Sequence, residues 1–204
     1  MHKTIGGKKR TNIQAMTIVG ILSAIAYILM FLEFSVPLMP GFIKMDLSDL
    51  PGLIGTFAVG PVGGIIICLI KNLLHLTVTS TGGVGELSNF ILNVAFILPA
   101  GLLYRFKKTK KSACGGAVIG AVFMAVISVA SNYFVVYPVY YNFMPEETIL
   151  AAYQAIFPGV ENMLQCLIVF NMPFTFVKAM ISVVVTFLIY NHLVPVIRMS
   201  RREA

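Results

Sequence analysis

Amide and ammonium side chains lie inside long apolar stretches of this sequence, where they could bind a small molecule. Asn171 and Lys178 are seven positions apart, and on an α-helix this spacing places two residues within about 20° of each other and about 10 Å apart along the axis. Asn132 and Asn89 lie in two other apolar stretches. Amides donate and accept hydrogen bonds, whereas an ammonium group only donates. The four residues are therefore candidate ligand-binding groups.

A purely structural role stays open for each asparagine, because such side chains also hydrogen-bond across membrane helix bundles, for about 0.6 kcal/mol on average. Lys178 is different, since it lies about 12 residues from either end of its stretch and is too deep to reach a membrane surface easily. We expect it to have a function. We expect Lys71, Asn72 and His75, which are close together in another stretch, to form a structural network.

The sequence lacks the motifs of several enzyme classes. It has no phosphate-binding Gly-x-x-x-x-Gly-Lys-Ser/Thr loop, no His-Glu-x-x-His pair and no Gly-x-Ser-x-Gly turn. Its three cysteines form no Cys-x-x-Cys pair, which disfavours a metal site or a disulfide framework. Every acidic residue except Glu203 is expected on one side of the membrane, so a proton relay has no carboxylate chain to follow. We expect neither an enzyme nor an ion-coupled pump, and no cofactor.

Composition indicates an integral membrane protein. Of 204 residues, 58% are hydrophobic and 11% charged, and the mean hydropathy is +0.88, far from the composition of a soluble domain. We predict one all-α membrane domain, 1–204, with six transmembrane helices. The expected spans are 13–32, 50–59, 61–78, 85–104, 112–137 and 166–190. The second span covers half a membrane unless Gly60 and Pro61 merely kink a longer hairpin.

The charges give the expected orientation. Of the 15 basic residues, 12 lie near the N-terminus, in the segment 105–111 or near the C-terminus, and such clusters favour the cytoplasmic side. We therefore expect both termini in the cytoplasm, outer loops at 33–49 and 138–165, and a location in the cell membrane. The net charge of +7 then reflects topology and not a nucleic-acid partner. The second outer loop contains a predicted amphipathic helix after Pro145, within 146–157.

Five segments give the sequence a specific resemblance, which covers nearly the whole chain. The sequence resembles the riboflavin-specific substrate-binding components, or S components, of energy-coupling factor (ECF) vitamin transporters. The segments are 31–49 (FLEFSVPLMPGFIKMDLSD), 51–75 (PGLIGTFAVGPVGGIIICLIKNLLH), 81–86 (TGGVGE), 132–141 (NYFVVYPVYY) and 171–178 (NMPFTFVK).

The resemblance implies that the protein captures riboflavin, its transported ligand, from outside and joins a transmembrane coupling subunit and two cytoplasmic ATPases. It places the ligand under the first outer loop, where the family's asparagine on helix five and its asparagine and lysine on helix six match Asn132, Asn171 and Lys178. We expect Lys178 to place its positive charge beside a carbonyl or ring nitrogen of the ligand, without needing a carboxylate partner.

The resemblance also suggests the remaining contacts. We expect Asn89 at the site, and aromatic and aliphatic side chains covering the flat ring system; these are Phe34, Leu38, Met39, Tyr137 and Tyr141. The family's coupling surface is a pair of alanines on helix one, matched here by Gly20 and Ala24, although internal packing against another span is an open alternative. Two other functions stay open: a stand-alone riboflavin facilitator or secondary carrier, and an S component for another small aromatic vitamin.

Overall fold

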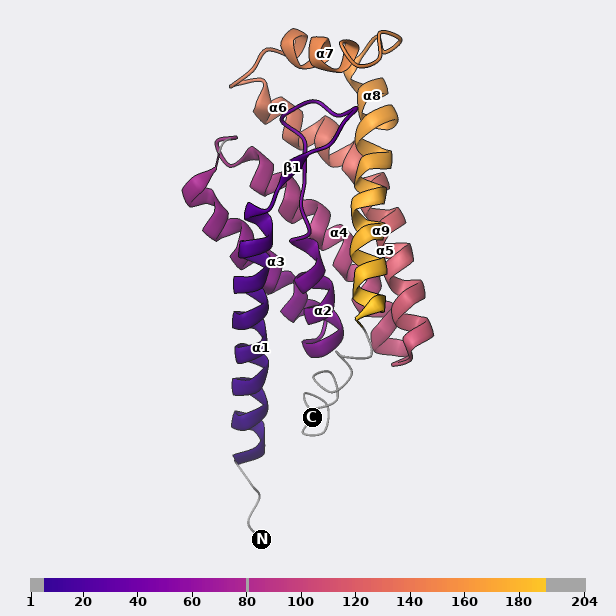
Figure 1. Cartoon of the computed structure of the whole chain (residues 1–204). Coiled ribbons are helices and arrows are strands. Elements are labelled where there is room, and N and C mark those ends of the chain that lie inside the picture. The colour runs from indigo at the N-terminus through magenta and orange to yellow at the C-terminus, as the bar shows by residue number, and fades with distance from the viewer. Residues whose placement is uncertain (1–5, 80, 190–204) are drawn as a thin grey trace.

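The computed structural model describes residues 6–79 and 81–189. Figure 1 shows these residues as a bundle of helices with one small two-stranded sheet. The first half consists of α1 (Gly6–Phe31), β1 (Phe34–Ser35), β2 (Lys44–Met45), α2 (Asp49–Val59), α3 (Pro61–His75) and the short 3-10 helix η1 (Leu76–Val78). The second half consists of α4 (Val84–Phe106), α5 (Lys110–Ser131), η2 (Asn132–Val136), α6 (Tyr137–Tyr140), α7 (Glu146–Gln154), α8 (Met163–Cys166), η3 (Leu167–Asn171) and α9 (Met172–Leu188).

Five helical stretches among the described residues are long and apolar enough to cross a membrane: Ile13–Phe31, Pro61–Val78, Val84–Phe106, Lys110–Tyr140 and Met163–Leu188. In a bilayer, a helix satisfies every backbone hydrogen bond internally, so apolar stretches fold this way. They agree with five of the expected spans within a few residues, except that the last begins at Met163 and its expected end, Tyr190, lies outside the described residues. The basic clusters at 3–10 and 198–202 lie outside the described side chains.

The remaining expected span is α2, which has 11 residues and is too short to cross a membrane alone. Gly60 ends it with a φ of +97°, a conformation that glycine adopts without steric cost, and Pro61 begins α3. A Cβ atom on Gly64 would lie 1.9 Å from Oγ1 of Thr56, which shows how closely α3 approaches α2. The pair forms a tight helical hairpin.

The hydrophobic core lies between α2, α4, α5 and α9. Small residues on α5, including Ala113, Ala117 and Ala121, are fully buried against larger side chains such as Leu53 of α2 and Phe96 of α4. Side chains this small let two helices approach closely. The core thus fixes how α4, α5 and α9 are oriented at the end of the bundle where the two outer loops were expected.

Two segments of π-helix interrupt the long helices near this end. η2 (Asn132–Val136) continues α5, and η3 (Leu167–Asn171) leads into α9. A π-helical turn holds an extra residue and is frequent at functional sites, because it re-aims the side chains around it. Asn132 begins the first segment and Asn171 ends the second, so the two asparagines predicted to bind ligand both lie at the edge of a π-helical segment.

The loop between α1 and α2 and the segment from α6 to α8 cover this end of the bundle, as Figure 1 shows, while the α4–α5 connection lies at the opposite end. Phe34 pairs with Met45 and Ser35 with Lys44 in the antiparallel hairpin β1–β2. α7 confirms the predicted amphipathic helix: it begins after Pro145 and buries Ile149 and Tyr153 completely in a second apolar cluster with Tyr137, Val160, Met163, Cys166, Leu167 and Phe170.

Candidate functional site

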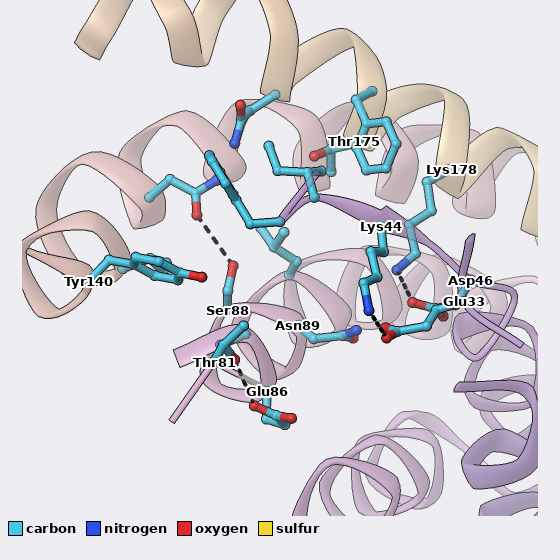
Figure 2. Close-up of a pocket in the computed structure, with 18 of the residues that line it drawn as sticks. Glu33, Lys44, Asp46, Thr81, Glu86, Ser88, Asn89, Tyr140, Thr175 and Lys178 are labelled. Carbon is cyan, nitrogen blue, oxygen red and sulfur yellow. Dashed lines mark hydrogen bonds and ion pairs between the residues drawn. The ribbon is translucent and has the colours of Figure 1, made fainter. Parts of the chain in front are cut away.

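A cavity of about 190 Å³ lies where the α1–α2 loop, α4 and the π-helical ends of α5 and α9 meet. Figure 2 shows side chains from these elements converging on it. Its lining includes the amides Asn89, Asn132 and Asn171, the hydroxyl residues Thr81, Ser88, Thr175, Tyr137 and Tyr140, and six charged or ionisable residues, which are Glu33, Lys44, Asp46, His75, Glu86 and Lys178. Apolar surface comes from residues such as Phe42, Ile43, Leu92, Met124, Val136 and Phe174.

Each carboxylate in the lining faces a basic side chain. The pairs are Glu33 with Lys44, Asp46 with Lys178 (Oδ2 to Nζ, 2.9 Å) and Glu86 with His75 (Oε1 to Nδ1, 2.7 Å); Figure 2 draws the first two as dashed lines. The hydroxyl of Thr79 also donates to Glu86 (2.9 Å). Because each lysine and carboxylate of the lining already has a partner within the protein, the cavity suits a neutral polar occupant better than an ion.

The Asp46–Lys178 pair belongs to a buried cluster of four charges. Nζ of Lys178 is also 3.7 Å from Oδ2 of Asp49, and Nζ of Lys71 lies 3.0 Å from Oδ1 of Asp49 and donates to the hydroxyl of Ser48. Burial alone would raise the pKa of Asp46, but Lys178, Lys71 and the Ser48 hydroxyl together hold it well below its usual range. The cluster fixes the end of the α1–α2 loop to α3 and α9.

This cluster corrects one expectation about Lys178. From the sequence we expect Lys178 to bind a carbonyl or ring nitrogen of the ligand without needing a carboxylate partner. In the structure the loop descends at 46–49 and brings Asp46 and Asp49 to it. Lys178 does line the cavity, but two carboxylates already bind its charge. The expected structural network around Lys71 agrees with its contacts to Asp49 and Ser48.

The three candidate amides all line the cavity, and each carbonyl oxygen accepts a hydrogen bond from a neighbour. The hydroxyl of Ser88 bonds Oδ1 of Asn132 (3.3 Å), the hydroxyl of Tyr153 donates to Oδ1 of Asn171 (2.6 Å), and the amide of Asn93 donates to Oδ1 of Asn89 (2.6 Å). The prediction that Asn171 and Lys178 share one face is confirmed, because both line this cavity from the same helical stretch.

The expected apolar contacts are only partly brought together. Tyr137 lines the cavity, whereas Phe34 and Leu38 are 56% and 76% exposed and lie outside its lining. Met39 and Tyr141 pack against the second apolar cluster and also lie outside the cavity lining. Leu38 has a φ of +68°, which marks a turn in the loop shortly before Phe42 and Ile43.

Other residues of the same segments take those places. Phe42 and Ile43 are the apolar residues of the first outer loop that line the cavity, and Tyr140 lines it in place of its neighbour Tyr141. Helical spacing could have identified Tyr140, which is three residues after Tyr137, and Thr175, which is three residues before Lys178. The loop residues could not be chosen in this way, because an irregular loop has no periodicity.

Comparisons with known proteins agree with this architecture. Residues 14–190 match the family described as "ECF transporter, substrate-specific component". The chain belongs to this family. It is 32% identical to "Riboflavin transporter RibU" of Staphylococcus aureus, over 93% of this chain and 96% of that protein, and 31% identical to "Riboflavin transporter FmnP" of Bacillus subtilis, over 93% and 97%.

A solved structure, from work on the structure and mechanism of the S component of a bacterial ECF transporter, has the same fold. It superposes with a TM-score of 0.72 at 31% sequence identity and covers 90% of this chain and 97% of that one. This substrate-specific component is thus a multi-pass membrane protein that takes part in transport and is not an enzyme. Among its described residues, no three His, Cys, Asp or Glu side chains are placed to hold a metal ion.

Two small residues of this ECF component were predicted to contact a partner. Gly20 and Ala24 lie on an exposed face of α1, and a Cβ atom on Gly20 would meet nothing within 4 Å. A second pair of small residues four positions apart is Gly60 and Gly64, and Gly64 forms the tight α2–α3 contact with Thr56. The α1 surface at Gly20 and Ala24 is therefore available for contact with another helix, whereas Gly64 packs inside the α2–α3 hairpin.

Proposed function

We propose that this chain is the riboflavin-binding subunit of an ATP-driven vitamin uptake transporter. In this proposal it captures riboflavin at the outer side of the cell membrane and delivers it together with a transmembrane coupling subunit and two cytoplasmic ATPases. Its relatives are named as riboflavin transporters, which supports riboflavin as the ligand. The family description, a substrate-specific component, and the absence of a phosphate-binding loop in the sequence support the division of labour.

The observation that carries the proposal is the group of amides in a cavity whose lysines and carboxylates already have partners within the protein. Riboflavin has a neutral, flat ring system whose polar edge presents a carbonyl, an N–H and a second carbonyl. Asn132 and Asn171 supply hydrogen bonds to such an edge, and Lys178 adds a donor beside them. Phe42, Ile43 and the other apolar lining residues provide the surface that a flat ring needs to be shielded from water.

The proposed topology has six transmembrane helices in one domain, with α2 and α3 as a hairpin and both termini in the cytoplasm. Its support is the placement of the basic α4–α5 connection at the end of the bundle opposite the cavity, together with the preference of basic loops for the cytoplasm. The cavity then opens toward the outside, as capture requires.

Riboflavin titration of the purified subunit tests the ligand. We expect riboflavin fluorescence to be quenched on binding, and Asn132→Ala and Asn171→Ala to weaken binding about 5- to 150-fold, since each variant leaves a buried ligand group without a partner at a cost of about 1 to 3 kcal/mol. Asn142→Ala is the matched control, because Asn142 is exposed and outside the cavity. Binding of both Asn132→Ala and Asn171→Ala with the affinity of the parent would place the pocket elsewhere.

A vesicle experiment tests the division of labour. The subunit alone, reconstituted without ATP, should bind riboflavin but not accumulate it. Robust uptake by the subunit alone would instead indicate a stand-alone carrier. A preference for another aromatic vitamin in competition titrations would indicate an S component of different specificity.

A further inference from the structure

We propose that Tyr153, which lies outside the cavity on α7, is a positioning residue that orients the amide of Asn171 so that its NH2 group serves the ligand. The inference rests on the proposed function and extends it, because it assigns a role in recognition to the surface helix between α6 and α8. It also fixes which hydrogen-bonding groups the site presents.

The contacts of Tyr153 carry the first step. The side chain is fully buried although it comes from a surface helix, and its hydroxyl lies 2.6 Å from Oδ1 of Asn171 and 2.6 Å from the hydroxyl of Tyr137. Its ring packs beside Phe170 and Phe42, with centroids 5.2 and 6.1 Å apart. α7 thus delivers one hydroxyl group to the back of Asn171.

The direction of these hydrogen bonds follows from the number of protons. An amide oxygen can only accept, so the single proton of the Tyr153 hydroxyl is used on Asn171. The proton between the two tyrosines must then come from Tyr137. The result is a chain from Tyr137 through Tyr153 to Asn171, and bonds in such a chain polarise and strengthen one another. Burial raises the pKa of Tyr153 above its usual range, so the hydroxyl keeps its proton.

This chain determines what Asn171 offers on its cavity side. With the oxygen held by Tyr153, an occupant meets the NH2 group, which has two donors. The hydroxyl of Ser88 occupies the oxygen of Asn132 in the same way (3.3 Å), and Figure 2 draws this contact as a dashed line from Ser88. Both amides therefore act as donors, and the matching ligand groups are acceptors, namely carbonyl oxygens or ring nitrogens.

A double-mutant cycle tests the role of Tyr153. Tyr153→Phe removes the hydroxyl and keeps the ring, so we expect riboflavin affinity, measured by fluorescence quenching, to fall about 5- to 20-fold, the effect of one lost orienting hydrogen bond. In the Asn171→Ala background the same change should have almost no effect, because the amide that it orients is gone. Tyr133→Phe is the matched control, since Tyr133 is 42% exposed and outside the cavity lining.

Two results would overturn the inference. One is an affinity of Tyr153→Phe for riboflavin equal to that of the parent. The other is a double variant in which the affinity losses of Tyr153→Phe and Asn171→Ala multiply, as expected if Tyr153→Phe only loosens the protein in general. Should Tyr153→Phe fail to fold, as judged by its melting curve without ligand, Tyr137→Phe replaces it in the same cycle, because it removes the donor to Tyr153, and the same two results apply. If the parent itself does not bind riboflavin, the proposed function fails, which is distinct from failure of the positioning role.

Discussion

Nζ of Lys178 on α9 lies 2.9 Å from Oδ2 of Asp46 in the α1–α2 loop, although 132 residues separate the two in sequence. Both side chains are buried and both line the cavity. The pair therefore has two effects: it attaches the loop to the bundle, and it sets the charge of the ligand site.

Breaking this pair should lower the stability of the ligand-free protein. Asp46→Asn or Lys178→Met alone leaves a buried charge without its partner, for an expected loss of about 3 to 5 kcal/mol, whereas the double variant leaves the neutral pair of Asp49 and Lys71 and should lose less than the sum. Melting temperatures without ligand measure this. The partly exposed pair Glu33–Lys44 is the control, with an expected effect below about 1 kcal/mol. Additive losses for Asp46 and Lys178 would contradict the coupling.

The stabilisation that Asp46 provides should depend on pH in one direction. Its pKa is lower in the folded protein than the value of about 3.9 expected in the unfolded chain. The unfolded state therefore takes up the proton first, so the stabilisation is complete above about pH 4 and declines as the pH falls further. The difference in melting temperature between the parent and Asp46→Asn should be constant from about pH 7 to 5 and shrink toward pH 3. A change already between pH 7 and 5 would assign the effect to another group.

Lys71 and His75 are expected from the sequence to form one structural network, but truncation of the two side chains should have different effects. Lys71 is fully buried and lies outside the cavity lining, so Lys71→Ala should lower the melting temperature without ligand and leave riboflavin affinity almost unchanged in any fraction that folds. His75 holds Glu86 at the cavity wall, so His75→Ala should also weaken riboflavin binding. Equal changes in affinity for both variants would contradict this distinction.

Periodicity and charge could predict the long helices, α7 and the shared face of Asn171 and Lys178, because these depend on local spacing and on the cost of polar groups in lipid. The partner of Lys178 could not be predicted in this way, since it depends on the path of an irregular loop. The π-helical segments that hold Asn132 and Asn171 were also missed, because the insertion of one residue in a helical turn leaves no signal in hydrophobic spacing. Phe42 lines the cavity where Leu38 is expected from the sequence. Tertiary contacts determine which residues of this loop face the bundle, as they do for Asp46.

Two glycines of α5 should give opposite results when changed to alanine. A Cβ atom on Gly120 would lie 2.3 Å from the backbone oxygen of Phe96 on α4, whereas one on Gly115 would meet nothing within 4 Å. Gly120→Ala must push α4 and α5 apart and should destabilise by about 1 to 3 kcal/mol. Gly115→Ala should be neutral or stabilising by up to about 1 kcal/mol, because alanine favours the helix. Melting curves compare them, and equal melting temperatures would mean that the α4–α5 contact is not tight.

The exposed small residues of α1 provide a test of partner assembly that leaves the ligand site intact. Gly20 and Ala24 are one helical turn apart on an exposed face, and small residues at this spacing let another helix approach closely. Gly20→Trp or Ala24→Trp should therefore abolish co-purification with the coupling subunit. Riboflavin affinity of the isolated subunit should persist, because neither residue lines the cavity. Ile119→Trp on an exposed face of α5 is the control for bulk alone and should assemble normally. Loss of riboflavin binding with intact co-purification would instead show that these residues support ligand binding and not partner assembly.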